Sequence, residues 1–230
     1  MEQPAPEPAL MLLIDKPANW TSFDVVNKIR WACKFKKIGH AGTLDPLATG
    51  LLILCTGKLT KQIDSYQAQE KEYTGTLVLG KTTPSVDLET GFDAEFPVTG
   101  ITPEAITEAV RQLTGTITQI PPIYSALRVN GERLYEKARR GESVDIKSRT
   151  TEVPVFEIDT DRFPELDFRI ICAKGTYVRS LVRDLGSLLN NGAYLKSLRR
   201  TRIGDFRVDN AQTIEEFINQ FNQLGVKSRA

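Results

Sequence analysis

The alternation of apolar and polar residues along the chain predicts short strands separated by helices. A short apolar run bounded by turn residues is typical of a buried strand, and strict alternation is typical of a strand with one exposed face. The stretch from Lys71 to Leu79 alternates in this way, which places Tyr73 and Leu77 on one face. Strands are predicted over residues 10–14, 51–55, 71–79, 152–159 and 166–173.

Helices are indicated by start signals that precede helically spaced apolar residues. Thr21 and Thr213 are each followed three residues later by an acid, which is the pattern of a capping box. Thr102 with the proline after it is typical of a first helical turn. Helices are predicted to begin near residues 21, 102, 133, 176 and 213.

These elements lack the regular strand–helix–strand order of a doubly wound sheet. We therefore expect an α+β fold with a mixed, largely antiparallel central sheet flanked by helices and loops. A chain of 230 residues with 40% hydrophobic content can bury one sizeable core. We expect a disordered, Pro-rich tail over residues 1–9 and a single domain over residues 10–230.

Cysteine usage and hydropathy bear on the compartment. The three cysteines are widely spaced and form no C-x-x-C pair, so neither a disulfide framework nor a structural zinc site is expected. No apolar run approaches the ~20 residues that a membrane span needs. The acidic, Pro-rich start is the opposite of a signal peptide. We expect a cytoplasmic protein with free thiols and no membrane association.

The net charge of +1 does not by itself indicate a partner, so the distribution of charge matters more. Seven basic and four acidic residues lie between Arg128 and Arg149, and five basic residues and one acid lie between Lys196 and Arg207. Three further lysines lie at positions 34, 36 and 37. Separated basic segments would suit a polyanion that lies across one face. Ordinary solvated surface is the alternative interpretation.

The segment HAGTLDPLATG, from His40 to Gly50, is the strongest candidate for chemistry. It holds the only histidine of the chain, and its glycines together with Pro46 predict a loop. The apolar run after it anchors this loop in the core, and enzymes often place a reactive group on such a loop. Asp45 is either a reactive carboxylate or the acceptor of a structural turn.

Absent motifs narrow the chemistry further. The chain contains no G-x-G-x-x-G, so a dinucleotide site has no support, and a single histidine excludes a His-rich metal site. We therefore expect no metal and no cofactor, and chemistry that depends on Asp, Arg, Tyr and Lys side chains. A carboxylate nucleophile suits an electrophilic sugar carbon or a conjugated ring.

Six blocks of sequence, taken together, resemble the motifs of one family in their order along the chain. HAGTLDPLATG resembles the catalytic motif of the bacterial TruB-type tRNA pseudouridine synthases, and the other blocks resemble its remaining motifs. After Gly80 the family usually shows a T-x-T-x-D-x-x-G pattern, which Thr83, Ser85 and Asp87 fit loosely, while Gly91 lies one residue later than in the pattern. We also expect the chain to lack the C-terminal PUA-type domain of many members. The blocks are residues 13–17, 40–50, 71–80, 121–139, 174–186 and 198–206.

The resemblance implies the pseudouridine synthase fold and the conversion of one T-loop uridine, tRNA position 55, to pseudouridine. In this reaction the N1–C1′ bond breaks, the uracil turns over, and C5 joins C1′. No redox change occurs, so the reaction needs no cofactor. The resemblance also implies that the T stem-loop of tRNA is the partner. We expect a monomer with no obligate protein partner.

The resemblance assigns roles to four residues. Asp45 would start the reaction at C1′, at C6 or at the C2′ proton, and these three routes stay open. Arg179 would pair with Asp45 and favour its ionised form. Tyr73 would stack on the target uracil and take part in proton transfer. His40 would fill the stack that the flipped-out base leaves.

Cations that are scattered along the chain suit an A-form stem, because such a stem is recognised by its shape and backbone. Each candidate has solvated surface as its alternative interpretation. The candidate phosphate contacts are Lys16, Lys36, Lys37, Arg128, Arg133, Arg139, Arg199 and Arg200.

Three other functions stay open. A nucleoside hydrolase that used Asp45 would release free uracil, whereas an isomerase leaves the RNA mass unchanged. A non-enzymatic RNA-binding module would keep the fold without the chemistry. A guide-RNA-dependent relative would need protein partners. The joint presence of Asp45, Tyr73 and Arg179 favours a catalytic protein.

Overall fold

The computed structural model describes residues 8–125, 127–129, 131–142 and 144–227. The chain divides into two compact units, which we describe separately. Unit 1 comprises Met1–Tyr73 and Arg199–Ala230, and unit 2 comprises Thr74–Leu198. Strands β4 (Lys71–Leu79) and β13 (Ala193–Ile203) each begin in one unit and end in the other. The expectation that residues 10–230 act as a single domain stays a prediction.

Unit 1 is built around β3 (Thr49–Thr56). The strand β1 (Met11–Lys16) pairs antiparallel along β3, with Met11 opposite Cys55 and Lys16 opposite Gly50. The short β2 (Ile38–His40) pairs antiparallel with the end of β3. The last part of β13 pairs parallel with the start of β3 and antiparallel with β14 (Phe206–Arg207).

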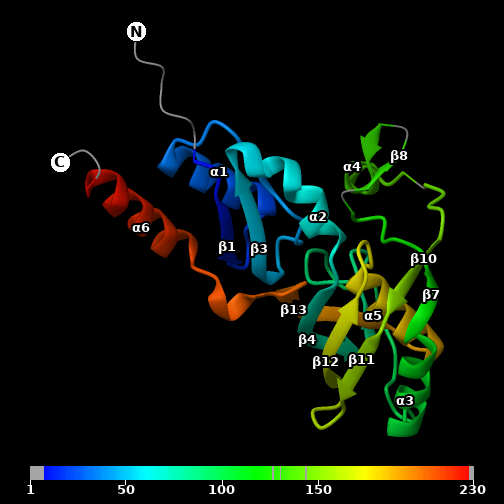
Figure 1. The fold of residues 1–230 in the computed structure, drawn as a ribbon. Coiled ribbons are helices and arrows are strands. Elements are labelled where there is room, and N and C mark those ends of the chain that lie inside the picture. The colour runs from blue at the N-terminus through cyan, green and yellow to red at the C-terminus, as the bar shows by residue number, and fades with distance from the viewer. Residues whose placement is uncertain (1–7, 126, 130, 143, 228–230) are drawn as a thin grey trace. The chain divides into compact units, whose positions relative to one another are not determined.

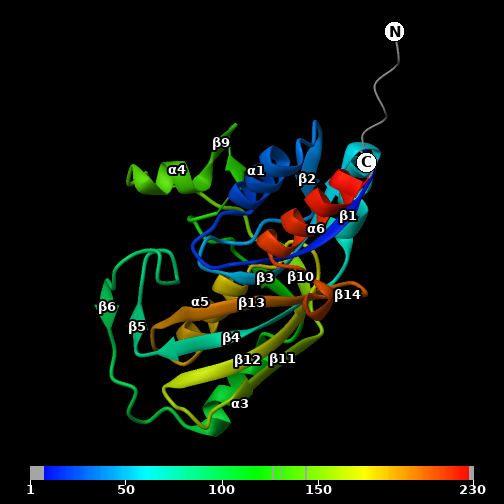
Figure 2. The ribbon, with the colours of Figure 1, turned by 90° about the vertical axis from the view of Figure 1, so that its left-hand side faces the viewer.

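The strand β3 is buried on both faces, which explains its continuous apolar sequence. Leu52 and Leu54 pack in one cluster with α1 (Ser22–Cys33) and α6 (Ile214–Lys227). Leu51 and Ile53 pack in a second cluster on the other face. Figures 1 and 2 show α1 and α6 beside β1 and β3. The remaining helical segments of unit 1 are η1 (Gly57–Gln62), α2 (Ile63–Ala68) and η2 (Val208–Asn210).

Unit 2 contains a row of strands in the order β13, β4, β12 (Glu165–Cys172) and β11 (Val155–Asp159). The helix α3 (Pro103–Gln112) contacts β11 and also α5 (Val178–Leu188). Three two-stranded ladders complete the unit (Figure 2). The first pairs β5 (Lys81–Thr82) with β6 (Ala94–Glu95), and the second pairs β7 (Gly115–Gln119) with β10 (Arg149–Val153). The third pairs β8 (Arg128–Val129) with β9 (Glu132–Arg133). The helix α4 (Leu134–Arg139) follows β9.

The α+β prediction is confirmed, and the sheet is mixed, since β3 pairs parallel with β13 and antiparallel with β1. Both predicted capping boxes are present, at Thr21 with Asp24 and at Thr213 with Glu216. The predicted strand over 152–159 is wrong, because it is two strands that meet at Pro154 and pair with different partners. In the part of the chain that the structure describes, no helix is both long and apolar enough to cross a membrane.

Candidate active site

The loop that carries Asp45 connects β2 to β3 in unit 1. The Ala48 amide donates to the Asp45 carbonyl at 3.1 Å, which closes a turn around Pro46. Gly50, the second residue of β3 after the loop, has a φ of 101°. A Cβ there would lie 2.3 Å from the Arg200 carbonyl oxygen, so only glycine fits between the two backbones.

The start of α1 holds the same loop from outside. Ser22 is buried, and its Oγ accepts a hydrogen bond from the Leu44 amide at 2.9 Å and donates to the Leu44 carbonyl at 3.3 Å. Because the capping box at Thr21 fixes the first turn of α1, the position of Ser22 is fixed as well. The residue before Asp45 is therefore attached to a regular helix.

Lys16, at the end of β1, is fully buried against the Asp45 loop. Its Nζ donates to the carbonyls of Pro17 at 2.9 Å, Trp20 at 2.5 Å and Pro46 at 3.2 Å. Burial lowers the pKa of Lys16 from 10.5 to about 8, and the charge of Asp45 partly opposes this. The lysine thus places one positive charge next to the loop.

Arg200 is also buried and supports the loop from the β13 side. Its Nε donates to the Leu51 carbonyl at 2.8 Å, and its Nη2 donates to the Gly42 carbonyl at 3.2 Å. One bond therefore reaches the loop at Gly42 and the other reaches β3 just after the loop.

Two of the predicted phosphate contacts are therefore corrected. Lys16 and Arg200 are 0% and 1% exposed, so neither presents its charge to a polyanion at the surface. Their donor groups are directed at backbone carbonyls of the Asp45 loop and its flanks. We conclude that both cations position the loop.

Arg199 is partly exposed and forms an ion pair with the carboxylate of Asp15. Its Nη1 and Nη2 donate to Asp15 Oδ1 at 3.0 Å and Oδ2 at 2.7 Å, a bidentate pair. The side chain is 41% exposed. Lys36 and Lys37 are exposed in the segment between α1 and β2. The phosphate-contact role of these three residues stays a prediction.

His40 lies at the end of β2, at the start of the Asp45 loop, and is half-buried. Burial lowers the pKa of its imidazole, while a hydrogen bond with the Gly42 backbone partly opposes this. The ring is therefore neutral at pH 7, which suits a planar side chain that stacks.

Tyr73 lies on β4 and is the last residue of the first of the two chain segments that form unit 1. It is buried, with 9% of its surface exposed. Lys71, two residues earlier on the same strand, is also buried and donates to the carbonyls of Gln67 and Gln69. The predicted stacking role of Tyr73 on a uracil stays a prediction.

Arg179 lies in the first turn of α5 in unit 2, as predicted, and is 3% exposed. Its Nη1 donates to the Ser85 carbonyl at 2.9 Å and its Nη2 to the Tyr124 carbonyl at 2.7 Å. Asp87 Oδ2 lies 3.7 Å from its Nε, so the two form a buried ion pair. Asp45 belongs to unit 1, and its pairing with Arg179 stays a prediction.

The loop that holds Arg179 contains a strained residue. Val86 has a φ of 62°, a conformation that a β-branched residue rarely adopts. It lies between Ser85 and Asp87, which both contact the guanidinium, and its own carbonyl accepts from the Leu195 amide. Sequence reasoning missed Asp87 as a partner of Arg179. The available signal was its loose match to the family's T-x-T-x-D pattern.

The remaining predicted cations lie on the β8–β9 hairpin and α4. Arg139 is exposed, lies 3.6 Å from Glu89 and stacks over the Tyr135 ring at 5.5 Å. The backbones of Arg128 and Arg133 face each other in the hairpin. Their side chains lie outside the described part of the structure. None of the three roles as phosphate contacts is tested.

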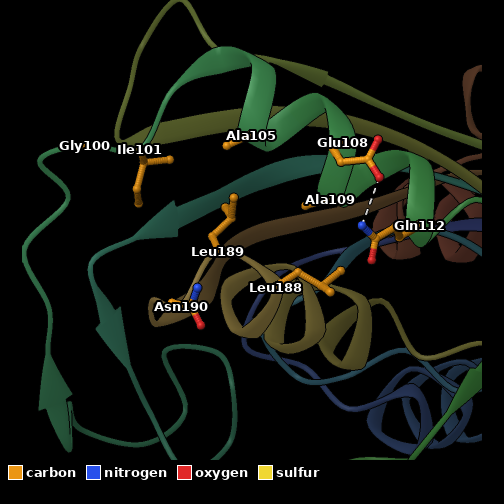
Figure 3. A pocket seen from close by; sticks show the side chains of 9 residues that line it. All are labelled: Gly100, Ile101, Ala105, Glu108, Ala109, Gln112, Leu188, Leu189 and Asn190. Carbon is orange, nitrogen blue, oxygen red and sulfur yellow. Dashed lines mark hydrogen bonds between the residues drawn. The ribbon is translucent and has the colours of Figure 1, made fainter.

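A hollow of about 270 Å³ in unit 2 lies away from the residues described above. Figure 3 shows it between α3 and the end of α5, with Leu188, Leu189 and Asn190 on one side. On the other side Gln112 Nε2 donates to Glu108 Oε1 at 3.0 Å (Figure 3). None of the predicted site residues lines this hollow, and we do not place the chemistry there.

Comparison with known proteins identifies the class. Residues 30–178 match the family described as TruB family pseudouridylate synthase (N terminal domain). Residues 179–225 match the tRNA pseudouridylate synthase B C-terminal domain. The chain belongs to the TruB family of pseudouridylate synthases. It is therefore an RNA-modifying enzyme, an isomerase that forms pseudouridine.

Individual relatives match over most of their length. A tRNA pseudouridine synthase B from Flavobacterium johnsoniae is 54% identical over 214 residues, which cover 90% of this chain and 93% of the relative. A protein of the same name from Phocaeicola vulgatus is 49% identical, with coverage of 94% and 95%.

A solved structure supports the fold. The chain superposes on one from a crystal structure of a Cbf5–Nop10–Gar1 complex with a TM-score of 0.70 and 27% identity. The match covers 91% of this chain and 53% of the other, so this chain spans about half the length of that solved chain. The pseudouridine synthase fold is thus confirmed.

Proposed function

We propose that this enzyme is a tRNA pseudouridine synthase that modifies the T-loop uridine at position 55 and uses Asp45 to start the reaction. The substrate follows from the relatives, whose name is tRNA pseudouridine synthase B and which this chain matches over 93% and 95% of their length. The role of Asp45 rests on one observation. A regular helix, a buried lysine and a buried arginine all hold the loop that carries it.

The reaction is an isomerisation. The N1–C1′ bond breaks, the uracil turns, and a C5–C1′ bond forms; N1 gains a proton and C5 loses one. Attack of Asp45 on C1′, attack on C6, or assistance at the C2′ proton each starts this sequence. In every route the carboxylate must stay at a fixed position while the base moves. The bonds of Lys16, Arg200 and Ser22 to the loop and its flanks supply that rigidity.

Three further roles belong to the proposal. Arg179 pairs with Asp45 in the working enzyme, and the Ser85 and Tyr124 carbonyls orient its guanidinium. Tyr73 stacks on the target uracil, and the neutral ring of His40 occupies the stack that the flipped-out base leaves. The tRNA is the macromolecular partner, and the remaining exposed candidate cations contact its backbone.

The test uses the full chain with an unmodified tRNA transcript. Wild type should convert one T-loop uridine, detected by pseudouridine mapping, without release of free uracil. Asp45→Asn keeps the size of the side chain and should bind the transcript with unchanged affinity but leave it unmodified. Turnover by Asp45→Asn that is within a few-fold of wild type would disprove the catalytic role.

The same experiment separates the alternatives. Free uracil in the reaction would identify a hydrolase, and RNA binding without any product by wild type would identify a binding module. Modification at another tRNA position would keep the enzyme class and disprove the assignment to position 55.

A further inference from the structure

One face of α1 combines exposed aromatic side chains with exposed cations. The opposite face, which includes Val25 and Ile29, packs in the core of unit 1. On the outer face Trp31 is 78% exposed and Phe23 is 65% exposed. The exposed residues of this face, which we call the α1 surface, are Phe23, Asp24, Lys28, Arg30, Trp31 and Lys34.

Helical spacing makes these side chains neighbours. Lys28 and Lys34 each lie three residues from Trp31, and Arg30 lies four residues before Lys34. No acidic residue occurs between Val25 and Leu44, a segment that carries five cations. The one acid of α1, Asp24, lies four residues before Lys28, and its carboxylate accepts from the Thr21 amide and hydroxyl. Trp31 therefore lies on a helix surface with three cations and one acid, which has a net positive charge.

The backbone at Lys34 is a second, independent observation. This residue ends α1 with φ 58° and ψ 33°, and its amide donates to the Arg30 carbonyl. A left-handed residue at the end of a helix is usually glycine, because a Cβ is strained there. An exposed lysine at this position points to a use for its charge. A structural alternative is that the cation stabilises the helix C-terminus.

The α1 surface has a fixed relation to the Asp45 loop, since Ser22 at the start of α1 bonds to Leu44. A helix of 12 residues is about 18 Å long. A nucleic acid strand of a few nucleotides spans that length. The surface therefore lies within reach of an RNA whose uridine is held at Asp45.

We propose that the α1 surface binds the substrate RNA beyond the reacting uridine. Its cations contact phosphates, and the Trp31 ring stacks on an unpaired base. The inference rests on the proposed function, since the RNA is that of a pseudouridine synthase. Trp and Lys also occur together on helices that lie on membranes, but α1 is joined to the loop that carries Asp45, which favours RNA.

Fluorescence tests the contact directly. The chain has two tryptophans, so Trp20→Phe leaves Trp31 as the single reporter. An unmodified tRNA transcript should quench and shift its emission with saturation, and vesicles that contain anionic lipid should not. No change at saturating transcript, or a change with vesicles alone, would overturn the proposal.

Substitution tests the stacking. Trp31→Ala should weaken transcript binding about tenfold, as expected for the loss of one stacked base. The KM should rise by a similar factor while kcat stays unchanged, because the contact is equal in ground and transition states. Leu224→Ala, which removes an exposed apolar side chain on α6, is the matched control and should change neither value. Equal affinities of the Trp31→Ala variant and wild type would overturn the proposal.

The charge of Lys34 and its left-handed backbone conformation can be tested separately. Lys34→Asn removes the charge while tolerating the left-handed conformation, so the thermal midpoint should stay unchanged. The slope of log Kd against log salt should fall by roughly one unit. Arg111→Gln, on the acid-rich face of α3, should leave the slope unchanged. A lower midpoint with an unchanged slope would show that the lysine serves only the helix end, and would overturn the proposal.

The two proposals fail in different ways. If wild type forms pseudouridine and the α1 variants bind RNA as it does, only the α1 proposal fails. If wild type binds the transcript, quenches Trp31 and forms no pseudouridine, the proposed function fails alone.

Discussion

At the scale of single residues, cations of the same type have different roles. Lys16 and Arg200 are buried and donate to backbone carbonyls, whereas Lys34 is exposed at the end of α1. Sequence reasoning listed the first two as candidate phosphate contacts, because cations scattered along the chain suit an A-form stem. Their burial follows from carbonyls that the folded loop leaves without partners, and these carbonyls are visible only in three dimensions.

Lys16 makes stability depend on pH. Its pKa is about 8 in the folded chain and 10.5 when exposed. Below pH 8 both states are protonated, and the buried charge costs the fold roughly 3 kcal/mol. Between pH 8 and 10.5 the unfolded state binds the extra proton, so stability rises with pH by up to about 1.4 kcal/mol per unit.

The Lys16→Met variant lacks this pH-dependent contribution to the unfolding free energy, and the methionine side chain fills a similar volume. We expect the difference in unfolding free energy, wild type minus variant, to be constant from pH 6 to 7.5 and to rise from pH 8 to 10. Urea denaturation at each pH measures it. A difference that stays constant over the whole range would show that Lys16 titrates normally.

At the scale of elements, the sequence predicted the starts of helices more reliably than the boundaries of strands. The capping boxes predicted helix starts because the signal lies within four residues. The predicted strand 152–159 failed at Pro154, which has no amide hydrogen to continue a ladder. The strand β13 was not predicted as a strand, since its basic residues hide the alternation.

The attachment of the Asp45 loop to α1 can be tested with one hydroxyl. Ser22→Ala removes the partner of the buried Leu44 amide and should lower the unfolding free energy by about 1–3 kcal/mol. Because the loop loses its link to the helix, kcat for pseudouridine formation should fall while the Kd for tRNA stays within twofold. Urea denaturation and single-turnover assays measure both effects.

Ser65→Ala is the matched control. Ser65 Oγ also donates to a backbone carbonyl, that of Gln62 at 2.7 Å, but on the exposed side of α2. Its removal should change stability by less than about 0.5 kcal/mol. If Ser22→Ala and Ser65→Ala lowered the unfolding free energy equally, the Ser22 hydrogen bonds would contribute no more than an exposed one.

At the scale of the whole molecule, each unit has its own buried thiols. Cys33 and Cys55 lie in unit 1 and Cys172 lies in unit 2. All three are buried, and none forms a disulfide among the described residues, as the sequence predicts. Burial raises the pKa of the Cys33 and Cys55 thiols, which lowers their thiolate fraction at pH 7.

These thiols report the opening of the two units. In the native protein all three should react with a thiol reagent far more slowly than free cysteine, because reaction requires local or global opening. All three should react at once in strong denaturant. Mass spectrometry after pulse labelling measures each site. Labelling of any of them at the rate of free cysteine in native conditions would contradict its burial.

The sequence by itself determined the helix starts, the apolar β3 and the Asp45 loop, since these depend on neighbours within a few residues. The family followed from motif order along the chain. Tertiary structure alone decided the strand order, the glycine-only approach of Gly50 to Arg200, and the partners of Lys16 and Arg179. The Pro46 carbonyl is 30 residues from Lys16, and the Ser85 carbonyl is 94 residues from Arg179. Burial and pKa depend on which distant groups the fold brings together.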